Sequence, residues 1–220
     1  MAAPLSSQPP RESYEITSPR LIIRTALESD AEGLHQFLTT PENFPHMPFN
    51  AGVTVEKLRA SIGRWKDMQA QGINAFLIIV LRETGEIIGQ GSYNCFDWVE
   101  APGTTGAGAV NGPDKEKKKK LTDFGVLLDH RHWRKGLGAE AICSMVNFAA
   151  EELGCSLFRT ETAEENEPWK AVIRSLGLKE FETFGPQSYD EKVNGWVWKF
   201  DADDWQKVKA KKQENGKWPL

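Results

Sequence analysis

The stretch HRHWRKGLGAEAI, residues 130–142, decides the fold that we expect for this chain. It follows the apolar run LTDFGVLLD, residues 121–129, and continues into a segment whose apolar residues have helical spacing. A strand, a glycine-bearing turn and a helix start form an anion cradle, because the first N–H groups of a helix lack partners and its dipole adds positive charge. Gly136 and Gly138 let the backbone approach an anion closely. The turn predicts a phosphate or pyrophosphate site, although an ordinary loop before a helix has a similar sequence; the nearby cations are Arg131, Arg134 and Lys135.

The composition is ordinary for a globular protein: 220 residues, 40% hydrophobic, 26% charged, with a formal net charge of −4. This acidic balance gives no argument for a nucleic-acid partner. No apolar run approaches the ~20 residues of a membrane span, and the first residues lack the apolar centre of a signal peptide. We therefore expect a cytoplasmic protein, monomeric or homodimeric, without a membrane or nucleic-acid partner. Its cysteines fit neither a metal pattern nor a disulfide set and are expected to be reduced and packed: Cys95, Cys143 and Cys155.

Composition along the chain predicts an arm, one domain and a tail. Residues 1–18, rich in Pro, Ser and charge, read as a disordered arm, and residues 19–201 as the domain. Within the domain, residues 97–120 change to Gly, Pro and Lys and predict a flexible insertion. Its run KEKKKK is either a solvated spacer, which we favour, or a contact for nucleic acid or an acidic membrane. Residues 202–220 predict a C-terminal helix, capped by Asp203, and a polar tail.

Apolar spacing inside the domain predicts the order βααβββαβαββ. The expected elements cover residues 20–26, 29–38, 54–71, 74–82, 86–96, 121–129, 138–153, 157–162, 168–176, 181–184 and 195–201. Strands 74–82 and 86–96 form an antiparallel hairpin, whereas strands 121–129 and 157–162 flank a helix as in a parallel βαβ unit. The predicted class is α/β (α+β), a single domain with a mixed, mostly antiparallel central sheet.

Over residues 19–201 the chain resembles the GNAT superfamily of acetyl-CoA-dependent N-acetyltransferases. Three features agree in order and spacing: the turn from Trp133 to Ala141, Asn166 in AEENEPW, and the pair Leu176 and Gly177. The block WRKGLGAEAICSMVNFAAEELG is similar to the branch that acetylates the N-termini of ribosomal proteins. The resemblance implies acetyl-CoA as cosubstrate. No metal is expected from the residues themselves, because His130 and His132 lack carboxylate or Cys companions.

The resemblance also implies which residues hold the cosubstrate. The backbone of Val126, Leu127 and Leu128 would pair with pantetheine amides where two parallel strands splay apart, and Asn166 would contact the pantetheine arm. The pyrophosphate would be held by Arg134, Lys135, Gly136, Leu137, Gly138 and Ala139. The residues alone indicate the same place, because α/β sheets bind ligands beside the carboxyl ends of parallel strands and at helix N-termini.

Acetyl transfer to an amine needs a base, a stabilised oxyanion and a proton for the leaving thiolate. Glu161, five residues before Asn166, matches the position of the general base in similar enzymes, and Asp123 is the second candidate. Each carboxylate can equally be a solvated charge at a strand end. A backbone N–H near Val126 would stabilise the oxyanion. Glu140, in the first turn of a predicted helix, is explained by the helix dipole alone.

The expected proton donor is missing. Family members often have a Ser three residues after the Asn or a Tyr seven residues after it, and here these positions hold Trp169 and Ile173. Of the tyrosines only Tyr189 could approach the site, so water is the expected donor; Trp169 either covers the pantetheine or belongs to the core.

The acceptor is left open between a protein N-terminus and a small amine. Acidic residues such as Glu42 and Glu164 would attract a cationic amine, and an apolar wall could be formed by Phe44, Met47 and Phe49. The predicted function is N-acetyltransfer to a primary amine by direct attack. The alternatives are a small-molecule detoxifying acetyltransferase and an acyl-CoA-binding regulatory module that has lost catalysis.

Overall fold

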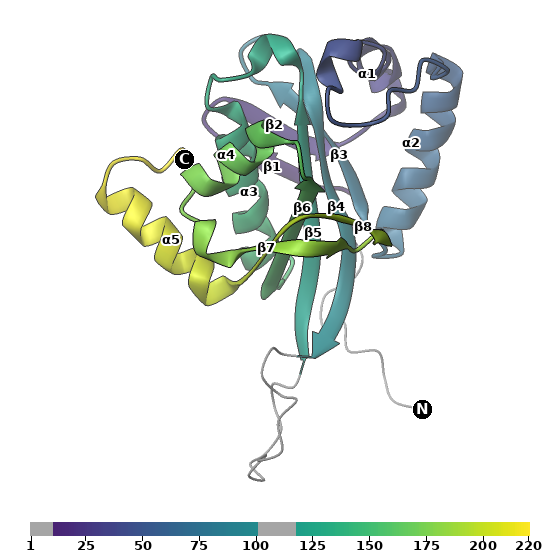
Figure 1. The fold of residues 1–220 in the computed structure, drawn as a ribbon. Coiled ribbons are helices and arrows are strands. Elements are labelled where there is room, and N and C mark those ends of the chain that lie inside the picture. Colours follow the sequence, from purple (N-terminus) through teal and green to yellow (C-terminus); the bar gives the residue numbers. More distant parts are fainter. Residues whose placement is uncertain (1–10, 101–117) are drawn as a thin grey trace.

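The structure, a computed structural model, describes residues 11–100 and 118–220 (Figure 1). Within these residues a mixed sheet has the strand order β1-β2-β3-β4-β5-β6-β8-β7. The strands are β1 (Glu15–Thr17), β2 (Leu21–Thr25), β3 (Ala75–Leu81), β4 (Ile87–Glu100), β5 (Lys118–Leu128), β6 (Leu157–Ala163), β7 (Glu182–Gln187) and β8 (Asp190–Asp201). The α-helices are α1 (Ala31–Leu38), α2 (Val55–Ala70), α3 (Leu137–Glu151), α4 (Glu167–Ser175) and α5 (Ala202–Glu214).

The described part of the sheet is antiparallel except between β5 and β6, which run parallel on either side of α3 in the sequence. This confirms the predicted class and the central βαβ unit. The hairpin of β3 and β4 and the helix that begins after Thr54 are also confirmed; the Thr54 hydroxyl accepts a hydrogen bond from the Lys57 N–H at 3.3 Å.

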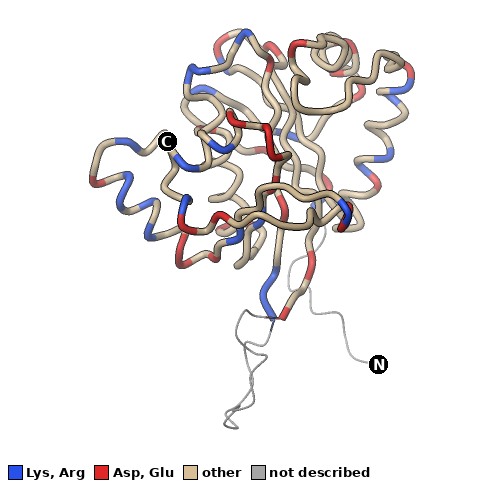
Figure 2. The backbone as a smooth tube through the Cα atoms, viewed as in Figure 1, with Lys and Arg blue, Asp and Glu red and all other residues tan. Residues whose placement is uncertain are grey.

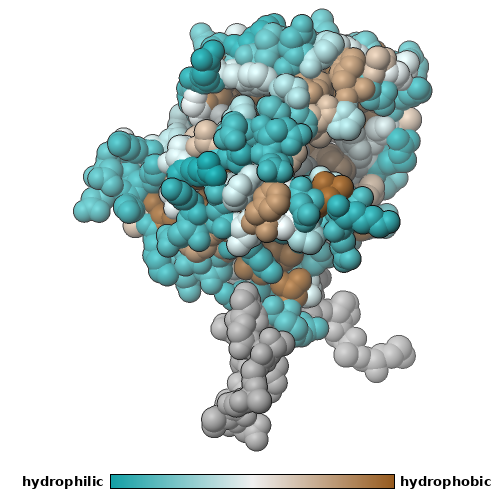
Figure 3. All heavy atoms as spheres, viewed as in Figure 1, coloured by the Kyte–Doolittle hydropathy of each residue, from teal (hydrophilic) through white to brown (hydrophobic). Residues whose placement is uncertain are grey.

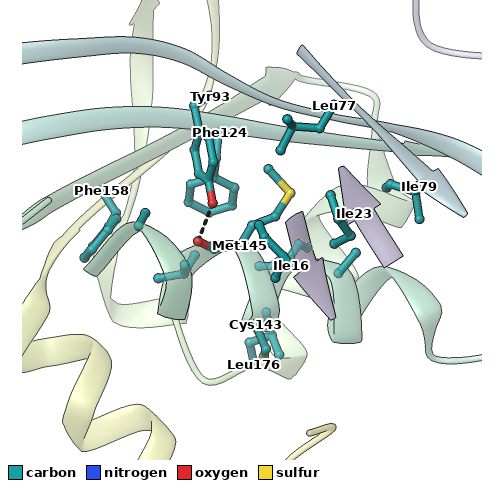
Figure 4. Packing of buried hydrophobic residues seen from close by; sticks show 14 of the residues in the cluster. Ile16, Ile23, Leu77, Ile79, Tyr93, Phe124, Cys143, Met145, Phe158 and Leu176 are labelled. Carbon is teal, nitrogen blue, oxygen red and sulfur yellow. Dashed lines mark hydrogen bonds between the residues drawn. The ribbon is translucent and has the colours of Figure 1, made fainter. Parts of the chain in front are cut away.

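Helices cover the sheet on both faces, and side-chain alternation along the strands assigns each face its own core (Figure 1). Ile78 and Val80 of β3 pack with α1 and α2, whereas Leu77 and Ile79 pack on the α3 side. In the larger core Tyr93 lies beside Phe124 and donates a hydrogen bond from its hydroxyl to the Met145 carbonyl in α3 at 2.7 Å (Figure 4). This bond ties the middle of β4 to the middle of α3.

Three of the sequence predictions about boundaries are wrong. The arm expected over residues 1–18 is structured at its C-terminal end, because β1 pairs with β2 and places Tyr14 and Ile16 in the core. The insertion expected over residues 97–120 is strand at both ends, in β4 and β5. The helix α5 is capped by Asp201 and not by Asp203. The Asp201 Oδ1 accepts a hydrogen bond from the Asp204 N–H at 3.0 Å. The rest of the arm and of the insertion lies outside the described residues.

The cysteines follow their prediction. Cys143 and Cys155 are buried, and burial raises the pKa of each thiol to about 12; Cys95 is half-buried, and burial raises its pKa to about 11. Within the described ranges there is neither a disulfide nor a cluster of metal-ligating side chains. No helix of these ranges has the length and apolar character needed to cross a membrane.

Candidate active site

The parallel strands β5 and β6 separate before they end. Their paired register stops at Asp123 and Arg159, although β5 continues to Leu128 and β6 to Ala163. At the point of separation the buried Thr160 hydroxyl donates to the Phe124 carbonyl at 2.9 Å. The side chain thus takes the place of a backbone donor and closes the parallel ladder, which leaves a gap between the strands beyond it.

The backbone of β5 faces this gap at alternate residues. The Asp129 N–H donates to the Ile88 carbonyl of the neighbouring chain segment at 2.8 Å, so Leu127 also turns its backbone groups toward β4 and those of Val126 and Leu128 face the gap. The Leu128 carbonyl accepts from the Trp133 indole N–H at 2.7 Å. The N–H and C=O of Val126 and the N–H of Leu128 therefore point into the gap. Leu127, the third residue expected to offer its backbone here, pairs with Gln90 and directs its backbone groups toward β4.

The turn before α3 has the features of an anion cradle. Gly136 is the N-cap residue with φ 78°, and no side chain caps the helix. Arg134 has φ 57°, which is uncommon for a residue with a side chain. The Glu140 N–H is the first to bond within the helix, to the Gly136 carbonyl at 3.1 Å. The N–H groups left without an intrahelical acceptor belong to Leu137, Gly138 and Ala139.

Not every basic residue of the quoted stretch belongs to this cradle. The Arg131 guanidinium binds Asp129 at 2.7 Å and Glu86 at 2.9 Å, so it serves the turn before the cradle. The His130 N–H donates to the Asn43 side chain at 2.8 Å. These contacts remove Arg131 as a free cation of the phosphate loop, while Arg134 and Lys135 are exposed beside it.

Asn166 has a local structural role. Its side-chain carbonyl accepts from the Trp169 N–H at 3.2 Å, which caps α4, and its amide donates to the Thr162 hydroxyl at 2.8 Å. The side chain is thereby fixed where β6 passes into α4. One amide N–H and one carbonyl lone pair remain available for a ligand.

Glu161 lies on β6 beyond the last paired residues. Its carboxylate accepts hydrogen bonds from the Ser188 N–H at 3.1 and 3.0 Å and from the Ser188 hydroxyl, so the turn between β7 and β8 orients it. Figure 2 shows acidic residues in red along the end of β6 and the loop into α4, where Glu161 is followed by Glu164, Glu165 and Glu167. This acidity suits a cationic acceptor.

Asp123 has a different environment, although it shares a sheet face with Glu161. Its buried carboxylate binds Arg159 Nε at 2.7 Å and accepts from the Asn94 amide at 2.7 Å. Asn94 reaches it because a bulge between Tyr93 and Cys95 leaves Asn94 unpaired. Burial raises the pKa of Asp123, while Arg159 and Asn94 oppose this by favouring the charged form.

The aromatic residues near the gap divide into buried and exposed ones. Ile173 is buried and Trp169 packs against the core, so neither position supplies a proton donor of the family type. Tyr189, beside Ser188, is 70% exposed, and burial of its hydroxyl and the neighbouring Glu161 raise its pKa. The high pKa keeps the hydroxyl protonated at neutral pH.

The loop between α1 and α2 forms a small apolar surface. Phe44 lies between Phe37 and Phe49, with ring centroids 5.9 Å apart in both pairs, and Met47 is 56% exposed. Figure 3 shows brown, hydrophobic side chains over this part of the molecule, within a mostly hydrophilic face. The loop presents the aromatic wall that its sequence predicts.

Several features came to light only in the structure. They are the Thr160 hydroxyl, the Trp133 indole, the Asn94 bulge and the Ser188 contacts, and each joins residues that the sequence keeps apart. Of these features, only the Ser188 contact had a signal in the sequence, because Ser188 lies next to Tyr189 in the loop expected before the last strand.

Comparison with known proteins points to one family. Residues 20–179 match the model of the acetyltransferase (GNAT) domain. A curated relative, the uncharacterized N-acetyltransferase p20 of Bacillus licheniformis, is 26% identical over 161 residues, which are 73% of this chain and 79% of the relative.

Solved structures share the fold at low identity. The ribosomal L7/L12 alpha-N-protein acetyltransferase RimL, in complex with coenzyme A, has a TM-score of 0.64 at 16% identity, over 86% of this chain and 99% of that one. FdhC, a nucleotide-linked sugar GNAT, has a TM-score of 0.66 at 13% identity, over 94% and 99%. These two proteins act on different kinds of acceptor, so the fold does not select the acceptor.

Proposed function

Because this chain belongs to the GNAT acetyltransferase family, whose cosubstrate is acetyl-CoA, we propose that it transfers the acetyl group to a primary amine by direct attack on the thioester. The observation that carries this proposal is the position of Glu161, oriented by Ser188 on the strand that borders the gap. Acetyl-CoA supplies an activated acyl group, and the residues of the chain bind it and move a proton.

The chain offers the cosubstrate two binding regions that its chemistry requires. The helix start at Leu137, Gly138 and Ala139 presents backbone donors for a pyrophosphate. Val126 and Leu128 present backbone groups in the gap. An amide-containing arm would form hydrogen bonds with these groups, as an added strand does at a sheet edge. The same Val126 N–H is the proposed donor to the oxyanion.

Glu161 is the proposed general base. A primary amine is mostly protonated at neutral pH and must lose a proton before it can attack. Glu161 would accept this proton directly or through one water, while Asp123 is held by Arg159 and Asn94 and serves to fix the strands. Water protonates the leaving thiolate in this proposal.

The acceptor class follows from the charges at the site. The carboxylates between Glu161 and Glu167 favour an acceptor that arrives as a cation, whether the N-terminus of a peptide or a small amine. The aromatic wall of Phe44 and Phe49 would bind an apolar group next to that amine.

The test is the pH dependence of acetyl transfer by Glu161→Gln, followed by thiol release on a panel of amines and peptides with free N-termini. We expect a loss of about 10²- to 10⁴-fold in kcat/KM near neutral pH that shrinks at alkaline pH, where the amine is neutral without a base. Glu214→Gln, which changes an exposed carboxylate at the C-terminal end of α5, is the matched control and should keep its activity. Activity of Glu161→Gln equal to the parent at every pH would remove Glu161 as the base.

The same assay separates the alternative function. Acetyl-CoA binding without thiol release on any acceptor would favour an acyl-CoA-binding module, which Trp169 and Ile173 at the positions of the family's Ser and Tyr donors make reasonable. Release on small amines but not on peptides would favour a small-molecule acetyltransferase.

A further inference from the structure

We propose that Arg20 and Glu140 position the pyrophosphate loop, and that Arg20 acts on the cosubstrate through the loop's shape rather than through its own charge. The proposal rests on the proposed binding of acetyl-CoA at this loop. Glu140 is completely buried and belongs to the first turn of α3, whereas Arg20 directly precedes β2. The two residues are 120 positions apart in the sequence.

The Glu140 carboxylate is bound by the segment between β1 and β2. One oxygen accepts from the Ser18 hydroxyl and from the Arg20 N–H, both at 2.7 Å, and the other accepts from Arg20 Nε at 2.6 Å. A buried carboxylate is costly unless it is paired and hydrogen-bonded, and here it is both. The helix dipole alone would not require these contacts, so Glu140 has more than the local role that its position predicts.

The Arg20 guanidinium extends from Glu140 to the loop. Its Nη1 donates to the Lys135 carbonyl at 2.8 Å. A Cβ placed on Gly136 would lie 3.4 Å from Arg20 Nη2, so the guanidinium is next to this residue. One planar side chain therefore binds a buried carboxylate with one edge and a loop carbonyl with the other, a geometry that lysine cannot reproduce.

The carbonyl contact determines the direction of an N–H group. In a trans peptide the C=O of one residue and the N–H of the next point in opposite directions, so the held Lys135 carbonyl turns the Gly136 N–H away from Arg20. Arg134 and Gly136 both have left-handed backbone conformations. This conformation is unfavourable for arginine, and the contact between Arg20 and the Lys135 carbonyl helps to maintain it. Arg20 thus fixes the direction of the Gly136 N–H, which directly precedes the cradle donors at the start of α3, before the ligand binds.

The test compares a ligand that reaches the loop with one that does not. Binding of CoA and of pantetheine, which lacks the pyrophosphate, is measured by calorimetry for the parent, Arg20→Lys, Glu140→Gln and Arg24→Lys. Arg24 is the matched control, because it is also an arginine of this segment with a carboxylate partner, and its guanidinium binds Asp30 and the Thr25 carbonyl instead of the loop. Thermal melting of each variant checks that it is folded.

We expect Arg20→Lys to weaken CoA binding by about 10- to 100-fold, the loss of one charge-assisted hydrogen bond, without change in pantetheine binding. In turnover, KM for acetyl-CoA should rise while kcat is nearly retained. Glu140→Gln should also weaken CoA binding, although removal of a negative charge near an anion would by Coulomb attraction alone strengthen it. Arg24→Lys should match the parent for both ligands.

Three results would overturn the proposal. One is an unchanged CoA affinity in Arg20→Lys, which would leave charge as the only requirement, and another is tighter CoA binding in Glu140→Gln. Equal loss of CoA and pantetheine binding in the variants would also overturn it, because it indicates a general structural effect. If the parent protein binds CoA no more tightly than pantetheine, the proposed cosubstrate site is wrong. The parent protein alone gives this result, so it is distinguished from failure of the positioning role, which only the variants reveal.

Discussion

Substitution of Thr160 by valine tests whether one hydroxyl ends the parallel ladder. Thr160 and Phe124 are almost fully buried, and the hydroxyl donates to the Phe124 carbonyl at 2.9 Å. Valine keeps the shape and the branched Cβ but removes the donor, so the carbonyl is left buried without this partner. Such a loss costs about 1–3 kcal/mol. For a chain of this size, about 2 kcal/mol lowers Tm by about 4–8 °C.

The assay is thermal unfolding by calorimetry or circular dichroism, together with KM for acetyl-CoA. Thr183→Val is the matched control, because the Thr183 hydroxyl donates to the Val197 carbonyl at 3.2 Å at an exposed position. Its Tm should fall by no more than about 2 °C, since water replaces the lost partner. We also expect KM to rise in Thr160→Val, because the Glu161 N–H is then free to pair with Phe124 and narrow the gap. Equal Tm values for the parent and Thr160→Val would refute the reasoning.

Two further predictions concern packing and pH. Gly89→Ala should lower the free energy of unfolding by at least about 1–3 kcal/mol and weaken CoA binding, because its Cβ would lie 2.2 Å from the Leu127 carbonyl oxygen. Gly185→Ala is the control and should change Tm little, because the space around Gly185 is open. Similar melting of both variants would contradict this prediction. Glu182→Gln removes the ion pair with Arg174, whose Nε and Nη2 lie 2.7 and 2.6 Å from the carboxylate. The side-chain hydrogen bond from Arg174 lowers the pKa of Glu182, so its stabilisation is present above the ordinary pKa of a glutamate and is lost as pH falls through the lowered value. The Tm difference between parent and variant should therefore be largest near neutral pH and vanish in acid; a difference independent of pH would exclude the ion pair as its cause.

The sequence predicts the elements whose pattern is local. The helices that follow Gly136 and Thr54 have periodic apolar residues, and each begins one residue from its predicted start. The strand before Gly136 begins at Lys118, three residues before its predicted start. The strand β1 has only three residues in a polar context, so its own sequence does not predict it. It forms because it pairs with β2 and because Tyr14 is buried in the core.

The extended ends of β4 and β5 show that strands in charged segments are hard to predict from sequence. Lys119 would be expected in a solvated loop, yet it lies in β5 opposite Val99 and its ammonium binds Asp201 at 2.8 Å. Lys120 donates to the Leu153 carbonyl at 3.0 Å. Long side chains can lie along a strand and reach polar partners, so charge alone does not exclude a strand.

Site residues divide in the same way. Glycines and backbone donors of the cradle are predictable because a local turn produces them. The Arg20 contact with Lys135 and the Asn94 contact with Asp123 require the assembled sheet, and a bulge becomes recognisable only when two strands are paired.

The two predicted carboxylates illustrate how the assembled sheet assigns roles. Asp123 and Arg159 form the last paired residues of the parallel ladder, and their ion pair, reinforced by Asn94, holds the strands together at that point. Glu161 follows two residues later on the same face of β6, where no β5 residue pairs with it. Burial raises the pKa of Asp123, and each of its carboxylate oxygens accepts from one donor, Asn94 or Arg159. Among the described residues, the Glu161 carboxylate accepts hydrogen bonds only from Ser188 in a surface turn, and a substrate or water can replace this partner at small cost. Adjacent carboxylates with such different surroundings suit different tasks, in agreement with our proposal that Glu161 accepts the proton and Asp123 holds the register of the gap.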